Sequence, residues 1–266
     1  MSKKIPKIIH YCWFGGNEKP ECILKCIKSW KKYCPDYEIK EWNETNFDIN
    51  LFQYTKEAYE AKKWAFVSEV ARLWVIYNYG GIYMDTDVEI LNNIDHIFEY
   101  DLFMFFQSER TLNTGMGFGA PKNNHIVKSI LDDYRKIQFV SNNGKYNMTA
   151  CPILNTNVLR EIVPEIQLNG HRQIINNMAF FSCADYNKLM YHYGAQSWTN
   201  EPNFEFKKRQ YKDNALKRFL RKPSRIDFIE KHVPKKLCSI YIFISYDLLE
   251  SGISKYIKKL FKKFSG

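Results

Sequence analysis

Long apolar runs are missing from this 266-residue chain. A transmembrane helix needs ~20 consecutive, mainly apolar residues, and no window of the sequence reaches that length. The charged start Met1–Pro6 also runs into no apolar stretch long enough for a signal peptide. These absences argue against a membrane-spanning or exported protein, so we expect a cytoplasmic chain.

Paired cysteines are missing as well. No two of the seven cysteines have CxxC spacing: Cys12, Cys22, Cys26, Cys34, Cys151, Cys183 and Cys238. Zinc ribbons use such pairs, and a disulfide framework normally uses an even number of cysteines. We therefore expect reduced thiols, most of them packed in the interior.

An excess of positive charge is missing from most of the chain, although the formal net charge is +10. From Lys207 onward there are 17 Lys and Arg against 5 Asp and Glu, which leaves 22 against 24 in residues 1–206. An enzyme acting on nucleic acid concentrates positive charge around its cleft. We therefore expect no nucleic-acid partner.

The composition that is present suits one packed α/β domain, with 45% hydrophobic and 16% aromatic residues. Residues 5–14 predict a buried strand that ends at a glycine pair, 20–33 a helix and 37–42 a second strand. Residues 55–79 predict one long helix, capped by Thr55 and ended by Gly80-Gly81. Later elements are predicted as a strand at 102–106, a helix at 125–136 and a strand at 188–192.

A short strand, Ile82–Met84, delivers Asp85-Thr86-Asp87 at its carboxyl end, where open α/β sheets bind ligands. Residues i and i+2 of an extended chain project to the same side, so we expect both carboxylates to reach one hard cation. Such a site leaves coordination positions free for a diphosphate. The cation then stabilises the charge of a departing nucleoside diphosphate.

The preceding helix carries Glu69 and Arg72, three residues apart on one face. A functional interpretation directs Arg72 toward the phosphates or sugar of a donor and Glu69 toward sugar hydroxyls. The alternative is an ordinary ion pair within the helix, which is worth only a few tenths of a kcal/mol.

Residues 206–266 predict a basic, mainly helical C-terminal extension. In Ile253–Phe264 the apolar residues recur at i, i+3, i+4, i+7, i+8 and i+11, and lysines occupy the opposite side. Such a helix can bind peripherally to the anionic cytoplasmic face of the plasma membrane. The alternative is a helix packed on the body with a solvated lysine face.

Three blocks in order resemble the DXD-containing sugar transferases of glycosyltransferase family thirty-two. The central block comprises 65–73 (AFVSEVARL) and 79–88 (YGGIYMDTDV), the opening block is 5–16 (IPKIIHYCWFGG), and the closing block contains His192 and Ser197-Trp198. That family includes bacterial capsule and lipopolysaccharide transferases and yeast initiating mannosyltransferases, with the clostridial glucosylating toxins as distant relatives.

The resemblance implies a single GT-A-type nucleotide-binding domain over residues 1–205, with a Rossmann-like mixed sheet flanked by helices. It implies transfer of a hexose, with retention of configuration, from a nucleotide sugar to a lipid-linked or oligosaccharide acceptor. We favour a UDP-sugar over GDP-mannose, Mn²⁺ or Mg²⁺ as cofactor, and synthesis of bacterial surface or capsular polysaccharide as the setting.

The resemblance also assigns roles by position. Trp13 would stack on the base, and Glu69 and Arg72 would hold the sugar and its phosphate. Asp85 and Asp87 would engage the ribose and the metal, and together with Arg72 they would be the catalytic residues. His192, Ser197 and Trp198 would close over the diphosphate, and His192 would also be a metal ligand. Relatives often carry Asp in place of Glu69, and a second His within the stretch that reads Tyr193–Gln196 here.

Two other functions remain open. An aspartate-nucleophile phosphatase also places a DxDx[TV] motif after a strand, but the fifth position here is Glu89. A non-catalytic, membrane-associated partner of a polysaccharide-synthesis complex would need only the basic extension, and it predicts no cation-dependent nucleotide binding.

Overall fold

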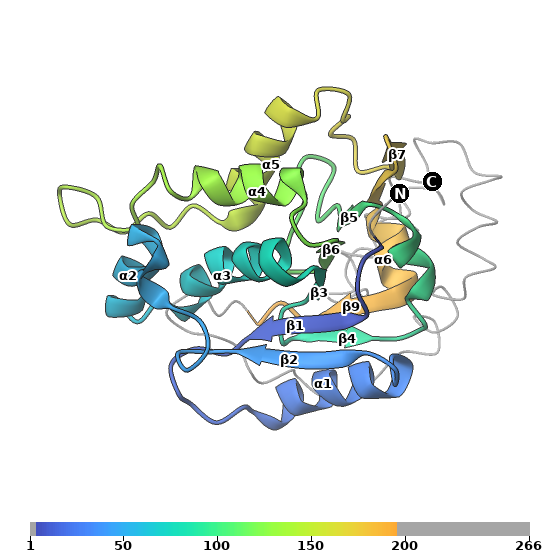
Figure 1. The fold of residues 1–266 in the computed structure, drawn as a ribbon, viewed down its shortest axis with the longest axis horizontal. Helices are drawn as coiled ribbons and strands as arrows, with labels where there is room; N and C mark the ends of the chain where they lie inside the picture. Colours follow the sequence, from blue (N-terminus) through green and yellow to red (C-terminus); the bar gives the residue numbers. More distant parts are fainter. Residues whose placement is uncertain (1–3, 196–266) are drawn as a thin grey trace, which may run out of the picture. The chain divides into compact units, whose positions relative to one another are not determined.

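The computed structural model describes residues 4–195 (Figure 1). The predictions for Ser197, Trp198, the helix Ile253–Phe264 and the extension 206–266 lie outside this range. Within it, no helix is long and apolar enough to cross a membrane.

A seven-stranded mixed sheet forms the centre of the fold. β1 runs parallel to β2 and β3, and β5 runs parallel to β8, whereas β6 and β7 are antiparallel to their neighbours. The predicted mixed α/β sheet is therefore confirmed. The strands lie in the order β2 (Glu38–Trp42), β1 (Ile8–Cys12), β3 (Gly81–Tyr83), β6 (Phe118–Ala120), β5 (Leu102–Phe105), β8 (Met178–Phe181) and β7 (Gln173–Ile175).

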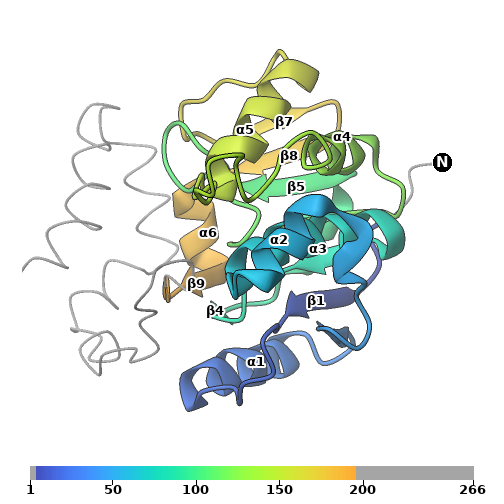
Figure 2. The ribbon, with the colours of Figure 1, turned by 90° about the vertical axis from the view of Figure 1, so that its left-hand side faces the viewer.

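Helices cover both faces of this sheet (Figures 1 and 2). One face is packed by α2 (Gln53–Glu60), α3 (Trp64–Tyr79), α4 (His125–Asp133) and α5 (Cys151–Ile162). The other is packed by α1 (Glu21–Tyr33), α6 (Cys183–Leu189), the 3-10 helix η2 (Asp95–Glu99) and the small sheet of β4 (Val88–Ile90) and β9 (Met190–His192). A second 3-10 helix, η1 (Ile49–Leu51), precedes α2.

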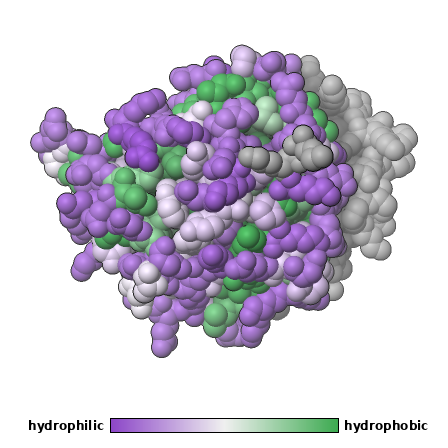
Figure 3. Space-filling view, in the orientation of Figure 1, coloured by the Kyte–Doolittle hydropathy of each residue, from purple (hydrophilic) through white to green (hydrophobic). Residues whose placement is uncertain are grey.

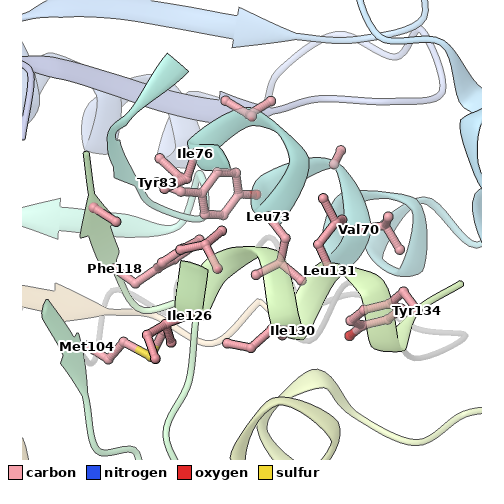
Figure 4. Close-up of a cluster of buried hydrophobic side chains, with 14 of the residues drawn as sticks. Val70, Leu73, Ile76, Tyr83, Met104, Phe118, Ile126, Ile130, Leu131 and Tyr134 are labelled. Carbon is pink, nitrogen blue, oxygen red and sulfur yellow. The ribbon is translucent and has the colours of Figure 1, made fainter. Parts of the chain in front are cut away.

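Alternation along the strands separates two hydrophobic clusters. In β5, Leu102 and Met104 belong to the cluster beneath α3 and α4, and Phe103 and Phe105 belong to the opposite cluster. Successive side chains of a strand point to opposite faces, so a strand buried on both sides is apolar throughout. Figure 4 shows the first cluster, where Leu73 of α3 packs near Leu131 of α4.

The predicted helix 55–79 is wrong in one respect, because the chain forms two helices there. Lys62, with φ 56°, turns the backbone between α2 and α3, and its neighbour Lys63 donates its amide to the carbonyl of Ala58. Thr55 lies inside α2, where its hydroxyl bonds the carbonyls of Ile49 and Phe52, so it is not the N-cap.

The predicted strand 188–192 begins two residues late, at Met190. α6 occupies Cys183–Leu189 and starts with a capping box, in which Ser182 and Asp185 exchange hydrogen bonds between side chain and backbone. This reciprocal bonding satisfies backbone N–H groups that have no partner within the first turn of a helix. The helix therefore includes Lys188 and Leu189, which were predicted as strand.

His10 of β1 ties the sheet to the end of α3. Its ring is fully buried; Nδ1 accepts a 3.0 Å hydrogen bond from Trp42 Nε1, and Nε2 lies 2.8 Å from the carbonyl oxygen of Gly80. Since Nδ1 is an acceptor, the bonding pattern assigns the proton to Nε2. Burial lowers the pKa of His10 to about 4, and the positive charge of Lys40 acts in the same direction.

We predict that His10 contributes to acid destabilisation. Its folded pKa is depressed, so its contribution to stability is present above pH 6.5 and is lost as the pH falls toward 4, by about 3 kcal/mol. His10→Gln, which cannot gain that proton, should be less stable than the wild type at pH 7.5, and the difference should shrink by pH 4 in urea unfolding. A difference that stays constant with pH would contradict this assignment.

Candidate metal and donor site

The predicted site residues gather at one edge of the sheet. Trp13 follows the carboxyl end of β1, and Asp85 follows the carboxyl end of β3. β6 is antiparallel to β3, so the segment 113–117 that leads into β6 reaches the same edge. Carboxyl ends of parallel strands are where open α/β sheets bind ligands.

Asp85 and Asp87 converge through a turn. The amide of Val88 donates to the carbonyl of Asp85 at 3.1 Å, and Thr86 and Asp87 occupy the bend between β3 and β4. The prediction that an extended backbone would direct both carboxylates toward one cation was therefore wrong about the backbone conformation. The turn brings the same two carboxylates together.

His192 reaches these aspartates through the pairing of β4 with β9. Val88 is in register with His192, and the amide of Tyr193 donates to the carbonyl of Asp87 at 3.0 Å. His192 Nε2 lies 3.2 Å from Asp87 Oδ1. One ligand atom from each of Asp85, Asp87 and His192 lies within 4.8 Å of the other two, which is the geometry of a candidate metal site.

Asp85 is held by a buried cation and a phenol. Arg72 Nη2 lies 2.9 Å from Asp85 Oδ1, and the Tyr83 hydroxyl donates to the same oxygen at 3.0 Å. The Arg72 side chain is only 5% exposed, its Nε donates to the carbonyl of Ser68, and its guanidinium lies 4.8 Å from the centre of the Tyr83 ring. Arg72 thus pairs with Asp85, and its contact with a donor stays a prediction.

Asp87 is buried and ionised. Its Oδ2 accepts a 2.6 Å hydrogen bond from the amide of Ala195, and its Oδ1 faces His192. Burial alone would raise the pKa of this carboxyl, but His192 and the Ala195 amide hold it below its usual value. Burial likewise opposes the charged form of His192, yet the Asp87 carboxylate raises the pKa of that ring.

Glu69 links α3 to the start of α5. Oε1 accepts from the amide of Cys151 at 3.2 Å, and Oε2 accepts from the Tyr54 hydroxyl at 3.4 Å. A carboxylate is favourable at a helix N-terminus, where amides lack intrahelical partners. Burial nevertheless raises the pKa of Glu69 to about 7, although Arg72 opposes the shift. The predicted contact of Glu69 with sugar hydroxyls stays a prediction.

Trp13 is half-buried beside the same edge. Its Nε1 donates to the carbonyl of Asn17 at 2.7 Å, and the Lys19 ammonium lies 5.6 Å from the ring centre. The predicted stacking of Trp13 on a base stays a prediction.

Gly115 is a site residue that the sequence analysis missed. Its carbonyl accepts from the amide of Asp85 at 2.9 Å, and its own amide donates to Asn113 Oδ1 at 2.7 Å. A Cβ at Gly115 would lie 2.1 Å from Asp85 Oδ2 and 2.9 Å from Arg72 Nη1. The available signal was the turn-type sequence Asn113-Thr114-Gly115, which gives no indication of what it contacts.

The donor set fits a small divalent cation. Two carboxylates supply the oxygen ligands that Mg²⁺ and Mn²⁺ use, and an imidazole nitrogen is more typical of a transition-metal ion. Asp85 Oδ1 is engaged by Arg72 and Tyr83, so its Oδ2 is the oxygen suited to the ion.

Comparison with known protein families finds a match that includes several of these residues. The family described as "Glycosyltransferase sugar-binding region containing DXD motif" matches residues 20–104. This stretch, about a third of the chain, is similar to the DXD region of sugar transferases. The DXD region includes Glu69, Arg72, Asp85 and Asp87, and the predicted resemblance to DXD-containing sugar transferases is confirmed.

Two curated relatives are mannosyltransferases of Schizosaccharomyces pombe. "Inositol phosphoceramide mannosyltransferase 3" is 32% identical over 141 residues, which cover 49% of this chain and 38% of that protein. "Inositol phosphoceramide mannosyltransferase 1" is 26% identical over 140 residues, which cover 48% and 42%. The chain therefore matches less than half the length of these relatives.

Two solved structures also show similarity. "PaToxG Glycosyltransferase" has a TM-score of 0.48 at 20% identity, covering 61% of this chain and 70% of that one. A glycosyltransferase "involved in the glycosylation of the major capsid of PBCV-1" has a TM-score of 0.42 at 13% identity, covering 73% and 98%.

We predict that Gly115→Ala will displace the Asp85 carboxylate. The added methyl cannot coexist with Oδ2, so the variant should lose about 1–3 kcal/mol of stability and bind Mn²⁺ at least tenfold more weakly. Urea unfolding and Mn²⁺ titration measure the two effects. In an Asp85→Ala background the stability cost of Gly115→Ala should be smaller, and an equal cost would show that the clash lies elsewhere.

Proposed function

We propose that this protein is a metal-dependent, retaining glycosyltransferase that moves a hexose from a nucleotide sugar, with UDP-hexose favoured, to a glycan acceptor. The observation that carries the proposal is the convergence of Asp85, Asp87 and His192, two of them within the DXD region, at the carboxyl edge of the sheet. The similarity to glycosyltransferases supports the same reaction class.

The residues of the site orient one another. Arg72 and Tyr83 fix one oxygen of Asp85, and the Ala195 amide and His192 keep Asp87 ionised. Asp85, Asp87 and His192 would hold Mn²⁺ or Mg²⁺, which when bound supplies Lewis-acid neutralisation of the charge on the departing diphosphate. Groups that are already oriented need no costly reorganisation during the reaction.

We propose front-face transfer. The acceptor oxygen bonds to the anomeric carbon as the bond from that carbon to the phosphate oxygen breaks, and the acceptor proton passes to this phosphate oxygen. The chain then needs to position the two substrates, and within residues 4–195 we assign no nucleophile and no general base. Arg72 and Glu69 would orient the donor from α3, as the resemblance implies.

The transferred sugar and the acceptor are also matters of proposal. The names of the two yeast relatives favour mannose as the transferred sugar and a phosphate-bearing acceptor. The setting that we favour is still the synthesis of bacterial surface or capsular polysaccharide, with a lipid-linked or oligosaccharide acceptor. In that setting the enzyme works at the cytoplasmic face of a membrane, which the basic extension contacts. A panel of UDP- and GDP-sugars, each tested for hydrolysis with Mn²⁺, separates these donors.

The two rival functions make different predictions. In a phosphatase one aspartate would be the nucleophile, yet Asp85 is paired with Arg72, and Glu89, the fifth position of the motif, accepts a 2.6 Å hydrogen bond from Tyr193. A non-catalytic partner would show no cation-dependent nucleotide binding. A rise in melting temperature with UDP or GDP that requires Mn²⁺ would contradict it.

We predict that Asp85→Asn and Asp87→Asn each reduce donor hydrolysis by at least a hundredfold, because each removes a carboxylate that would hold the cation. Hydrolysis of the best donor from the panel is measured with saturating Mn²⁺. Asp133→Asn is the matched control, since Asp133 is a carboxylate on the surface of α4, paired with Lys136. A folded Asp85 or Asp87 variant with wild-type rates would refute the proposed function.

We predict that His192→Ala weakens Mn²⁺ more than Mg²⁺. The imidazole nitrogen favours the transition-metal ion, so we expect about a tenfold loss of Mn²⁺ affinity and a smaller loss for Mg²⁺. Metal-dependent melting curves measure both, with the exposed His171→Ala as control. An unchanged Mn²⁺ affinity would remove His192 from the metal site, and equal losses for the two ions would contradict a role of its nitrogen in the preference for Mn²⁺.

A further inference from the structure

A cavity of about 450 Å³ lies beside α5, and none of its lining residues belongs to the Asp85, Asp87 and His192 cluster. Its wall combines two arginines with polar and aliphatic side chains, including Arg110, Thr111, Ile153, Asn157, Arg160 and Leu168. The face seen in Figure 3 is mainly hydrophilic, with separate apolar patches.

This cavity lies on the ligand-binding side of the sheet. Arg110 and Thr111 follow the carboxyl end of β5, the same edge at which Asp85 follows β3. Thr111 precedes Gly115, which contacts Asp85, by four residues. An extended chain covers at most ~3.6 Å per residue, so the cavity wall begins within about 14 Å of the donor site.

α5 connects the two sites rigidly. On one face, the backbone amide of Cys151 donates to Glu69 and the side-chain Nδ2 of Asn155 donates to Thr114 Oγ1 at 3.0 Å. On its exposed face, Ile153, Asn157 and Arg160 line the cavity. Thr156, between these faces, accepts a 3.0 Å hydrogen bond from the Leu112 amide and so anchors the loop that carries Arg110. α5 therefore contacts both the residues around Asp85 and the cavity.

The side chains that line the cavity suit a ligand that carries an anionic group next to an apolar surface. Neither guanidinium, of Arg110 or of Arg160, has an ion-pair partner among residues 4–195. The neighbouring carboxylates Glu109 and Glu161 are not among the described residues that line the cavity. Guanidinium groups bind phosphate and carboxylate with paired hydrogen bonds. Ile153, which is 50% exposed, offers apolar contact for the rest of the ligand.

We propose that this cavity is the acceptor subsite and that it recognises an oxyanion, a phosphate or a carboxylate, on the glycan acceptor. The proposal rests on the proposed glycosyltransferase function. Arg110 and Arg160 bind the anionic group, and α5 directs the acceptor hydroxyl toward the donor edge.

The test compares the wild type with the double variant Arg110→Gln and Arg160→Gln. The probes are glucose 1-phosphate, glucuronate and the neutral methyl glucoside, with binding measured by saturation-transfer NMR in Mg²⁺. Arg135→Gln is the matched control, because Arg135 is also exposed but pairs with Asp132 on α4. Donor hydrolysis without acceptor, and melting temperature, are measured on every variant.

We expect an anionic probe to bind the wild type and the Arg135 variant equally, and the double variant at least tenfold more weakly, with donor hydrolysis unchanged in all. Preference for glucose 1-phosphate identifies a phosphate acceptor, and preference for glucuronate a carboxylate acceptor. If no anionic probe binds, or the double variant binds as the wild type does, the acceptor subsite is refuted while measured donor hydrolysis keeps the proposed function. If no donor is hydrolysed, the proposed function fails whatever the probes show.

Discussion

The ion pair between the buried Arg72 and the partly exposed Asp85 is the interaction on which the site depends. A buried charge is costly unless it is paired and hydrogen-bonded, and here each partner meets the requirement of the other. The pair joins α3 to the turn after β3, and Tyr83 and Gly115 complete its surroundings. Because Arg72 and Tyr83 occupy one oxygen of Asp85, the other is directed to the side where Asp87 and His192 lie.

The small sheet of β4 and β9 provides the second constraint. It brings a strand from the end of the described chain alongside the acidic turn, so that His192 faces Asp87 and the Ala195 amide bonds the same carboxylate. The stretch beginning at Tyr193 contacts Asp87 through backbone groups. Backbone contacts of this kind do not depend on which side chains the segment carries.

α5 contacts both the residues around Asp85 and the cavity. Its first residue bonds Glu69, its buried face bonds the loop 113–115 next to Asp85, and its exposed face lines the cavity with Arg110 and Arg160. A single helix in contact with both regions keeps their separation constant, which is what transfer between two bound sugars requires. The proposed donor and acceptor sites are thus parts of one rigid arrangement.

The sequence by itself determined the α/β class, the β-α-β opening and the acidic pair after a strand, because these follow from local periodicity and from residues two or three apart, whereas the mixed sheet was implied only by the family resemblance. The resemblance named His192 beside the two aspartates, and the pairing of β4 with β9 shows how it reaches them. Tertiary structure alone decided that Arg72 pairs with Asp85 and that Gly115 leaves room for a carboxylate, since both depend on segments distant in the sequence. Lys62 likewise divided a helix that periodicity had predicted as continuous, because the left-handed conformation it adopts is set by the packing of α2 on α3.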